Sequence, residues 1–246
     1  MNVDVLAIVT GCSLLYNAAM PVSLSIIIPC LNEATHISAT LAVLQALRGK
    51  GAEVILVDGG SADHTLQLAE GYVDTVNQSP PGRAVQMNAG AELARGHLYW
   101  FLHADTVPDA DALVRIQDLA SNSVSLWGRF RVRFDHPSLI FKCIAWMMNT
   151  RSCLTAMATG DQGIFVSRDL FTQVDGYEDI PLMEDIAISK ALRKRQRPLC
   201  CRQTLSTSSR RWQQAGILRT IVLMWRLRAA YALGADPAQL AQRYRS

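Results

Sequence analysis

Runs of apolar residues alternate with amphipathic segments over the first half of the chain. Strands are predicted by the apolar, β-branched runs at 23–29, 53–57, 73–76 and 98–102. Residues 34–47, and the segment that begins at Arg83, carry apolar side chains at helical spacing. This alternation from residue 23 to residue 120 predicts an α/β fold, with a Rossmann-like, mainly parallel sheet and helices on both faces.

The second half of the chain changes character. At 129–134 three arginines alternate with apolar residues, which is typical of a strand with one apolar and one charged face, and we expect it to be antiparallel or at an edge. Further elements are predicted as helices at 137–149 and 183–194 and as strands at 163–167 and 198–205. Arg210–Trp212 lead into a predicted long helix, around 217–233, that is amphipathic and basic.

Composition places the chain among globular proteins. It has 246 residues, half of them apolar, which is enough for a substantial core. The stretch Val5–Met20 is apolar or neutral but short for a membrane span, and the segment lacks the basic start of a secretory signal. Residues 1–22 are therefore interpreted either as a dispensable extension, with Met20 as a natural start, or as a packed terminal element, ahead of the alternative of a transmembrane anchor or signal peptide.

Charge is distributed unevenly. Residues 187–246 contain 13 of the 24 Lys and Arg but only one of the 21 acids, Asp236. The acidic part suits a metal ion and the basic part suits phosphates or an anionic membrane surface. The six cysteines show no zinc-site spacing, so we expect reduced thiols and a cytoplasmic protein, with or without association with the inner face of the membrane.

Four carboxylates stand at predicted strand ends or at a helix start: Asp58, Asp105, Glu184 and Asp185. Sparse carboxylates of this kind suit Mg²⁺ or Mn²⁺ that also binds substrate phosphates. A carboxylate free of metal is needed to take a proton from an acceptor hydroxyl, and the first helical turn would hold Asp185 ionised. The plainer interpretation is that Glu184 or Asp185 only caps the helix.

Arg210, Arg211 and Trp212 offer guanidinium donors beside an aromatic face, which suits phosphate oxygens. The alternative is a solvated pair of arginines beside a core tryptophan. The basic tail lacks interleaved exposed aromatic residues and a recognition motif, which argues against a nucleic-acid partner.

Six short motifs occur in a recognisable order. They are Pro29–Glu33, Val57–Thr65, Leu102–Thr106, Gly160–Phe165, Met183–Asp185 and Arg210–Trp212. Together they resemble glycosyltransferase family 2, and most of all its small bacterial members with a His-Ala-Asp motif and an Ile-Pro-Leu-Met-Glu-Asp segment, here Ile180–Asp185. The resemblance implies the nucleotide-sugar-binding fold called GT-A.

The resemblance also implies roles for individual positions. Donor-binding positions would be Pro29, Asn32, Glu33, Asp58, Gly60, Arg83, Asn88, His103, Ala104 and Asp105. Acceptor or diphosphate contacts would come from Gly160, Asp161, Gln162, Arg211 and Trp212. Asp185 would be the general base, with Glu184 beside it, and Asp105 would bind Mn²⁺ or Mg²⁺, with or without His103 as a second ligand.

Three positions depart from the pattern of the resembled family. His103 replaces the first Asp of the usual Asp-x-Asp, so that metal binding rests mainly on Asp105 or includes the histidine. Gly59 stands where many members have a second Asp. Ser208 stands where processive members have Gln, which favours transfer of a single sugar.

The expected protein is thus an inverting, non-processive glycosyltransferase that moves a sugar from a nucleoside-diphosphate sugar to a hydroxyl of a lipid-linked or small-molecule acceptor. The resemblance divides 23–246, taken as one domain, into a donor half (23–120), an acceptor and catalytic half (121–212) and basic C-terminal helices (213–246). The alternatives are a weak or inactive nucleotide-sugar-binding module on a membrane, and a nucleotidyltransferase. The latter would prefer a Gly-rich, basic loop where Cys30–Glu33 stands.

Overall fold

The computed structural model describes residues 22–122 and 124–245, so the interpretations of residues 1–22 lie outside the described residues except at Val22. These two ranges contain a sheet of eight strands in the order β3-β2-β1-β4-β7-β6-β8-β5. The strands are β1 (Leu24–Cys30), β2 (Glu53–Asp58), β3 (Thr75–Gln78), β4 (Leu98–Phe101), β5 (Thr106–Pro108), β6 (Trp127–Phe134), β7 (Phe165–Ser167) and β8 (Leu199–Thr207).

Strand direction divides this sheet. The strands β3, β2, β1 and β4 are all parallel, as the alternation of strand and helix predicted. The strand β7 is antiparallel to β4 and β6, while β8 is parallel to β6 and antiparallel to β5. The predicted α/β fold with a mainly parallel sheet is confirmed. The strand β6 has an antiparallel neighbour, as expected, but it lies inside the sheet and not at an edge.

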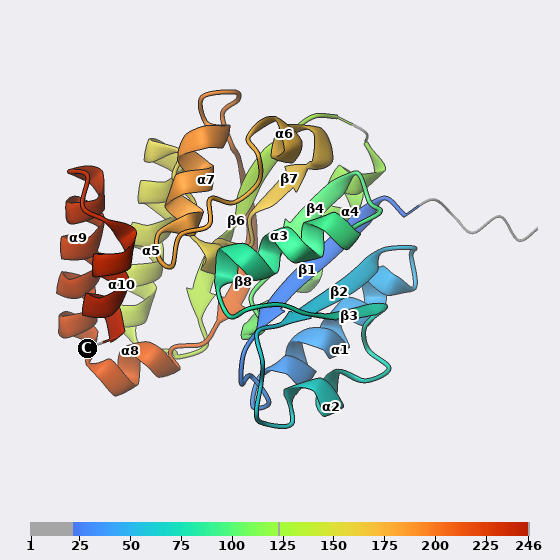
Figure 1. Cartoon of the computed structure of the whole chain (residues 1–246), viewed down its shortest axis with the longest axis horizontal. Coiled ribbons are helices and arrows are strands. Elements are labelled where there is room, and N and C mark those ends of the chain that lie inside the picture. The colour runs from blue at the N-terminus through green and yellow to red at the C-terminus, as the bar shows by residue number, and fades with distance from the viewer. Residues whose placement is uncertain (1–21, 123, 246) are drawn as a thin grey trace, which may run out of the picture.

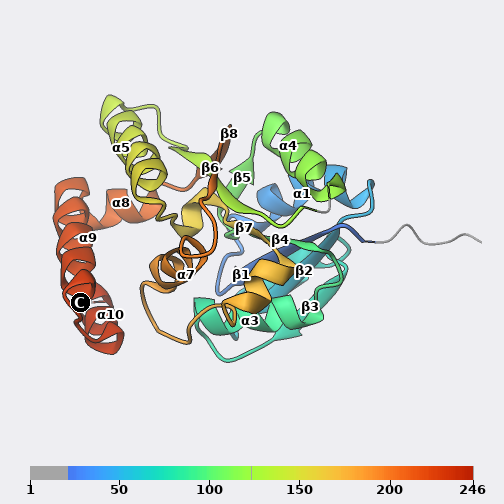
Figure 2. The ribbon, with the colours of Figure 1, turned by 90° about the horizontal axis from the view of Figure 1, so that it is seen from above.

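Helices cover both faces of the sheet (Figures 1 and 2). They are α1 (Ile37–Arg48), α2 (Thr65–Ala69), α3 (Arg83–Leu93), α4 (Ala110–Ser121), α5 (Leu139–Thr155), the 3₁₀ helix η1 (Gly160–Gln162), α6 (Arg168–Gln173), α7 (Glu184–Leu192), α8 (Arg210–Ala215), α9 (Ile217–Ala232) and α10 (Pro237–Arg245). None of the helices in the described ranges is long and apolar enough to cross a membrane.

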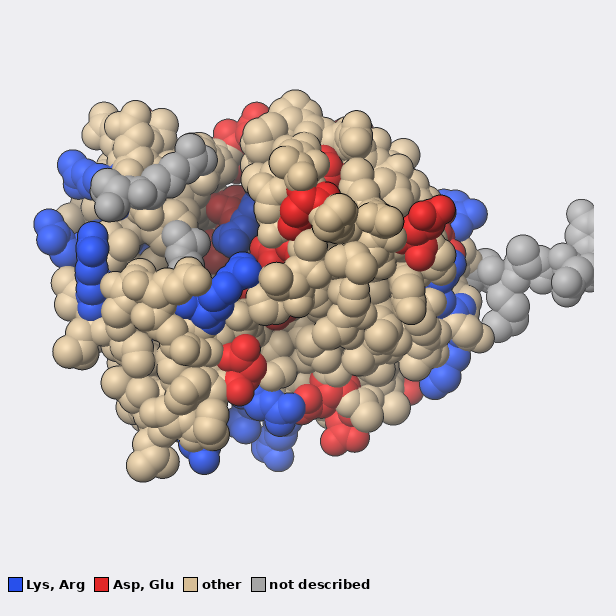
Figure 3. Space-filling view, turned by 90° about the horizontal axis from the view of Figure 1, so that it is seen from below, with Lys and Arg blue, Asp and Glu red and all other residues tan. Residues whose placement is uncertain are grey.

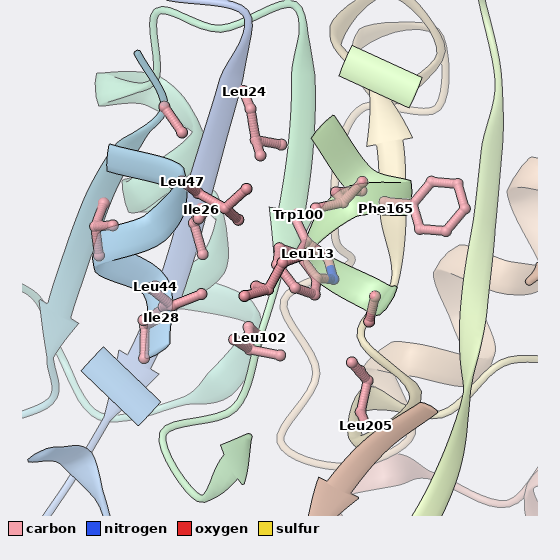
Figure 4. Close-up of a cluster of buried hydrophobic side chains, with 14 of the residues drawn as sticks. Leu24, Ile26, Ile28, Leu44, Leu47, Trp100, Leu102, Leu113, Phe165 and Leu205 are labelled. Atoms are coloured by element: carbon pink, nitrogen blue, oxygen red, sulfur yellow. The ribbon is translucent and has the colours of Figure 1, made fainter. Parts of the chain in front are cut away.

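Alternating side chains of the central strands supply two cores. Those on one face, such as Ile26 and Trp100, pack against α1 and α4 (Figure 4). Those on the other face, such as Ile27 and Phe101, pack against α3, α6 and α7. Because both faces are buried, β1, β2 and β4 read as continuous apolar runs, and this made them visible in the sequence.

One expectation for the second half is confirmed and one needs correction. The long basic helix expected around 217–233 is α9, and Gly216, with φ 85°, separates it from the short α8. Arg129 does not share the exposed face of Arg131 and Arg133 but is only 3% exposed. Its guanidinium donates hydrogen bonds to the carbonyls of Phe130 and, at 2.7 Å, Asn149, so it fastens β6 to α5.

A buried carboxylate joins the start of β2 to β1 and to the segment before β4. Glu53, at the start of β2, accepts hydrogen bonds from the Ser25 hydroxyl at 2.6 Å and from the backbone N–H of Arg95 at 2.6 Å. The Arg95 guanidinium lies 2.8 Å from its other oxygen. Burial opposes ionisation, but these hydrogen bonds lower the pKa of Glu53 below its usual 4.5.

We expect Glu53→Gln to lower the free energy of unfolding by about 1–3 kcal/mol at pH 7, because a charge-assisted acceptor is lost from a buried site. The folded-state pKa is the lower one, so the contribution of Glu53 is present above pH 4.5 and disappears as the pH falls through the folded value. Urea denaturation at pH 7 and at pH 4 measures both effects. Glu70→Gln, on an exposed side chain, is the control, and an equal loss in both variants would contradict the prediction.

Candidate active site

The loops that follow β1 and β2 are tied to each other. The side-chain oxygen of Asn32 accepts a hydrogen bond from the N–H of Ala62, while the N–H of Asn32 donates to the Ser61 hydroxyl, both at 2.9 Å. Asp58, only 1% exposed, accepts hydrogen bonds from the N–H groups of Gly60 and Ser61. These residues shape the carboxyl edge of the sheet, and their contact with a nucleoside stays a prediction.

Close packing around position 59 favours a glycine there. The Gln86 amide donates 2.8 Å hydrogen bonds to the carbonyls of Cys30 and Val57, which join the ends of β1 and β2. A Cβ atom on Gly59 would lie 3.2 Å from that amide nitrogen and 3.3 Å from Pro81 Cα. An aspartate at this position would therefore force the amide to shift.

A cavity of about 370 Å³ lies beyond the end of β4. Figure 3 shows a hollow of the surface in which acidic and basic side chains gather. Its polar part is formed where three elements meet: the end of β4, η1 and the start of α7. Cavities of this size bind small molecules. The charged or titratable side chains of this polar part are Arg83, His103, Asp105, Asp161, Glu184 and Asp185, while Arg151, Arg228 and Tyr244 line the cavity elsewhere.

The side chains of His103 and Asp161 contact each other on the wall of this cavity. The His103 Nδ1 atom lies 3.2 Å from an Asp161 carboxylate oxygen. Burial disfavours the charge of Asp161, but the hydrogen bond and charge of His103, together with Arg83, lower its pKa. Gly160 packs against the other side of the imidazole, where a Cβ would collide with Nε2. His103 is thus held in place from both sides.

Asp185 lies in the first turn of α7, where backbone N–H groups favour a negative charge. One carboxylate oxygen accepts a 3.2 Å hydrogen bond from the N–H of Gly160, and the other a 2.7 Å bond from Ile186. Burial and the neighbouring charge of Asp185 raise the pKa of Glu184, which lies 4.0 Å from the Arg83 guanidinium. Asp185 is the more accessible carboxylate of the two.

Asp105 extends into the cavity with little to hold its carboxylate. It accepts one long hydrogen bond, 3.4 Å, from the Thr106 hydroxyl. Its charge adds to the effect of burial in raising the pKa of nearby Glu33. One oxygen of Glu33 is buried without a hydrogen bond and lies 3.7 Å from the Arg210 guanidinium. This corner of the sheet edge therefore has spare carboxylate oxygen atoms.

No cluster of three or more His, Cys, Asp or Glu residues in the described ranges could hold a metal ion by itself. A hard cation that keeps waters and binds substrate phosphates needs only one or two protein carboxylates. Asp105 fits that requirement, because its oxygens are nearly free of protein partners. His103 fits it less well, since its Nδ1 atom is engaged by Asp161.

The cavity gathers about half of the positions implied by the resemblance, namely Arg83, His103, Asp105, Gly160, Asp161, Glu184, Asp185 and Trp212. Others do not line it, namely Pro29, Asn32, Glu33, Asp58, Gly60, Asn88, Ala104 and Gln162. The side chain of Arg211 lies outside the described structure.

Two of these outlying positions support the cavity wall. The Asn88 amide makes hydrogen bonds to both the N–H and the carbonyl of Tyr177, which tie α3 to the segment before α7. Gln162 is fully buried, and its amide donates to the Ser152 hydroxyl at 2.9 Å. Each fastens a loop by satisfying buried polar groups, and their expected ligand contacts stay predictions.

The sequence reasoning missed the opposite wall of the cavity, which α5 and α9 provide. Its residues are Ile144, Met147, Met148 and Arg151 on α5, and Ile221, Met224, Trp225 and Arg228 on α9. On each helix they occupy positions i, i+3, i+4 and i+7, so that one face carries apolar side chains and ends in an arginine. Because this spacing can be read from the sequence, it could have identified the two helix faces that form this wall.

Comparison with known proteins gives a family match. Residues 25–177 match the family model described as Glycosyl transferase family 2. A PGL/p-HBAD biosynthesis glycosyltransferase of Mycobacterium bovis is 36% identical over 100 residues, which cover 37% of this chain and 39% of that protein. A poly-beta-1,6-N-acetyl-D-glucosamine synthase of Staphylococcus aureus is 26% identical over 195 residues, 70% of this chain and 46% of that protein. The chain thus matches less than half the length of these relatives.

Solved structures of low sequence identity share the fold. A mannosyltransferase of Pyrobaculum calidifontis, in complex with GDP-Man and Mn²⁺, is 16% identical and superposes with a TM-score of 0.59. The match covers 87% of this chain and 64% of that one. The GT-A fold implied by the sequence motifs is confirmed.

We expect Gly160→Ala to push the His103 ring away and break its contact with Asp161, because the added Cβ would collide with Nε2. Overpacking of this kind costs about 1–3 kcal/mol of stability. Chemical denaturation and the imidazole NMR signals of His103 measure the two effects. Gly49→Ala is the matched control, since its Cβ would meet only the Gln45 carbonyl oxygen at 3.6 Å. Unchanged His103 signals would contradict the prediction.

Proposed function

The chain belongs to glycosyltransferase family 2, and on this basis we propose that it transfers a sugar from a nucleoside-diphosphate sugar to an acceptor hydroxyl with inversion at the anomeric carbon. One observation carries the proposal. A single cavity contains a carboxylate on a helix N-terminus, Asp185, and a nearly unpartnered carboxylate at a strand end, Asp105. The first suits a proton acceptor and the second suits the charged donor.

Asp185 is proposed as the general base. An alcohol is a weak nucleophile until it loses its proton, so a carboxylate within hydrogen-bond reach accelerates attack. The hydrogen bonds from Gly160 and Ile186 fix the orientation of Asp185 in the cavity. The hydroxyl oxygen forms the new bond to the anomeric carbon as the bond to the diphosphate oxygen breaks, and the proton passes to Asp185. Such a direct displacement requires no covalent sugar–enzyme intermediate.

Glu184 is proposed to support this base. Its raised pKa follows from burial and from the adjacent carboxylate, while Arg83 supplies a compensating charge 4.0 Å away. The charges of Glu184 and Asp161 in turn raise the pKa of Arg83, although burial opposes this. Arg83 therefore stays cationic beside the reacting groups, where it also suits the negative charge that develops on the leaving diphosphate.

Asp105 is proposed to hold Mn²⁺ or Mg²⁺ together with the donor. When bound, the ion supplies positive charge that neutralises the diphosphate. The Pyrobaculum calidifontis mannosyltransferase structure contains Mn²⁺ together with GDP-Man, which supports the proposal for this chain. Glu33 lies close enough to Asp105 for their charges to interact, and burial together with the charge of Asp105 raises the pKa of Glu33.

The proposed transfer adds one sugar. Ser208, which stands where processive members of the family have Gln, lines the cavity beside Thr207. Trp212 also lines the cavity and packs edge-on against Phe134, with the ring centroids 5.6 Å apart. These positions support an acceptor site between the end of β8 and α8. A cytoplasmic location is proposed with the same function.

We expect Asp185→Asn to reduce turnover about 10²- to 10⁴-fold, which is the usual contribution of a positioned base. Release of nucleoside diphosphate from a panel of nucleotide sugars, with water as the acceptor, measures turnover before the natural acceptor is known. Thermal shifts with the nucleoside diphosphates should remain, because the amide keeps an oxygen that can accept the Gly160 hydrogen bond. Asp179→Asn, on an exposed side chain, is the control, and wild-type turnover in Asp185→Asn would refute the role.

We expect Asp105→Asn to weaken the effect of Mn²⁺ on nucleotide binding by about tenfold, since one charge-assisted ligand is lost. Titrations of UDP and GDP, each with and without Mn²⁺, measure this as a change in Kd. Asp111→Asn is the control, because Asp111 is exposed in the first turn of α4. An Mn²⁺ effect that is the same in the Asp105→Asn variant and the wild type would remove Asp105 from the metal site.

A further inference from the structure

The wall of the cavity that α5 and α9 build combines two chemistries. Its apolar part consists of Ile144, Met147, Met148, Ile221, Met224 and Trp225. Arg151 and Arg228 each stand one helical turn further along the same faces and also line the cavity. Methionines adapt to ligands of irregular shape, and arginines bind oxyanions. The wall therefore suits a molecule that is apolar at one end and anionic at the other.

Neither arginine makes a contact ion pair among the described residues, although the charges of Asp185 and Asp161 act on Arg151 and Arg228 respectively. No hydrogen bond or ion pair within these ranges reaches either guanidinium, and Nη2 of Arg151 and Nε of Arg228 are buried without a partner. Burial and the charge of Arg228 lower the pKa of Arg151 to about 10, although Asp185 opposes this. Two like charges held together without partners are costly. A dianionic ligand would remove this cost.

We propose that Arg151 and Arg228 form an anion subsite for the acceptor, and that the acceptor carries a phosphate-type oxyanion next to an apolar group that packs on the methionine wall. This inference rests on the proposed function, because it names the substrate class of the same cavity. A phosphate ester matches two guanidinium groups in charge and in its number of acceptor oxygens.

The donor diphosphate is a poorer occupant of this subsite. Asp105, at the end of β4, is the group assigned to the donor, whereas the two arginines belong to helices of the outer layer (Figure 2). Asp185 is close enough to Arg151 to affect its pKa, so an acceptor anchored there would lie beside the base. The anion would hold the acceptor while a separate hydroxyl reaches Asp185.

The apolar wall continues to the surface of the molecule. Trp225 lines the cavity and is nevertheless 63% exposed, and Leu218 and Val222 on the same helix are also exposed. An apolar group longer than the cavity could therefore extend along α9. Two sources have the required chemistry, a soluble phosphate ester and an anionic lipid headgroup, and the experiment distinguishes them.

The probe is octyl phosphate, below its micellar concentration, titrated by calorimetry into the full chain. Inorganic phosphate and octyltrimethylammonium test the apolar and anionic requirements separately. We expect octyl phosphate to bind more tightly than either. Arg151→Met and Arg228→Met, which keep apolar bulk, should each weaken it about tenfold or more, since a hydrogen-bonded charge is worth about that factor. Arg226→Met, exposed on the same helix, should bind as the wild type does.

Three results would overturn the subsite: equal octyl phosphate affinity in the wild type and the two variants, octyltrimethylammonium bound as tightly as octyl phosphate, or variants that lose UDP or GDP binding instead. Thermal denaturation of each variant without ligand shows whether it is folded. Removing one of the two unpaired charges should leave Tm unchanged or higher.

Flotation with vesicles that contain phosphatidic acid identifies the source. Flotation that both variants lose supports a lipid headgroup, and octyl phosphate binding without flotation supports a soluble ester. If no nucleotide or nucleotide sugar binds the wild type, the proposed function fails while the octyl phosphate result still decides the subsite. If nucleotides bind and octyl phosphate does not, only the subsite fails.

Discussion

The structure depends on one buried strand, β4, which joins the parallel and antiparallel halves of the sheet. It is parallel to β1 on one side and antiparallel to β7 on the other, and all four of its residues are buried. At its last residue the N–H of Phe101 donates to the carbonyl of Ile164, and just past the strand the N–H of Leu102 donates to the carbonyl of Ile27. Beyond Leu102 the chain leaves both neighbours. His103 and Asp105 are thereby delivered to the place where the two halves meet.

The sequence sufficed for those elements of the fold that local patterns determine. Strands buried on both faces are continuous apolar runs, and the polar residues after them mark the edge of the sheet, so Asp105 could be placed without coordinates. The pairing of β8 with β6 and β5, and the meeting of α5 with α9 across the cavity, join residues distant in the chain. Local periodicity predicted α5 but not which residue of it faces Arg228. Arg129 was misplaced for the same reason, because its burial depends on Asn149.

Some charged side chains of the cavity have protein partners, while two places, here called its open ends, contain charged side chains that lack partners in the part of the chain that the structure describes. Asp161 is paired with His103 at 3.2 Å, and Glu184 lies 4.0 Å from Arg83, so these groups have protein partners. Asp105 at one end and the arginine pair of α5 and α9 at the other lack such partners in the described ranges. A folded protein tolerates uncompensated charge of this kind at a cost in stability. Such groups are retained where a ligand of opposite charge completes them.

The two open ends carry charges of opposite sign, so two anionic substrates could bind in one cavity in different ways. A carboxylate that repels a diphosphate becomes attractive only through a cation, so the Asp105 end would accept the proposed donor only together with its metal ion. The arginine end needs no cation and attracts an oxyanion directly. Asp185, whose charge acts on Arg151, is anchored to η1 through Gly160 rather than to either open end. The proposed base can therefore keep its position whichever of the two proposed substrates binds first, because neither has to displace the group that orients it.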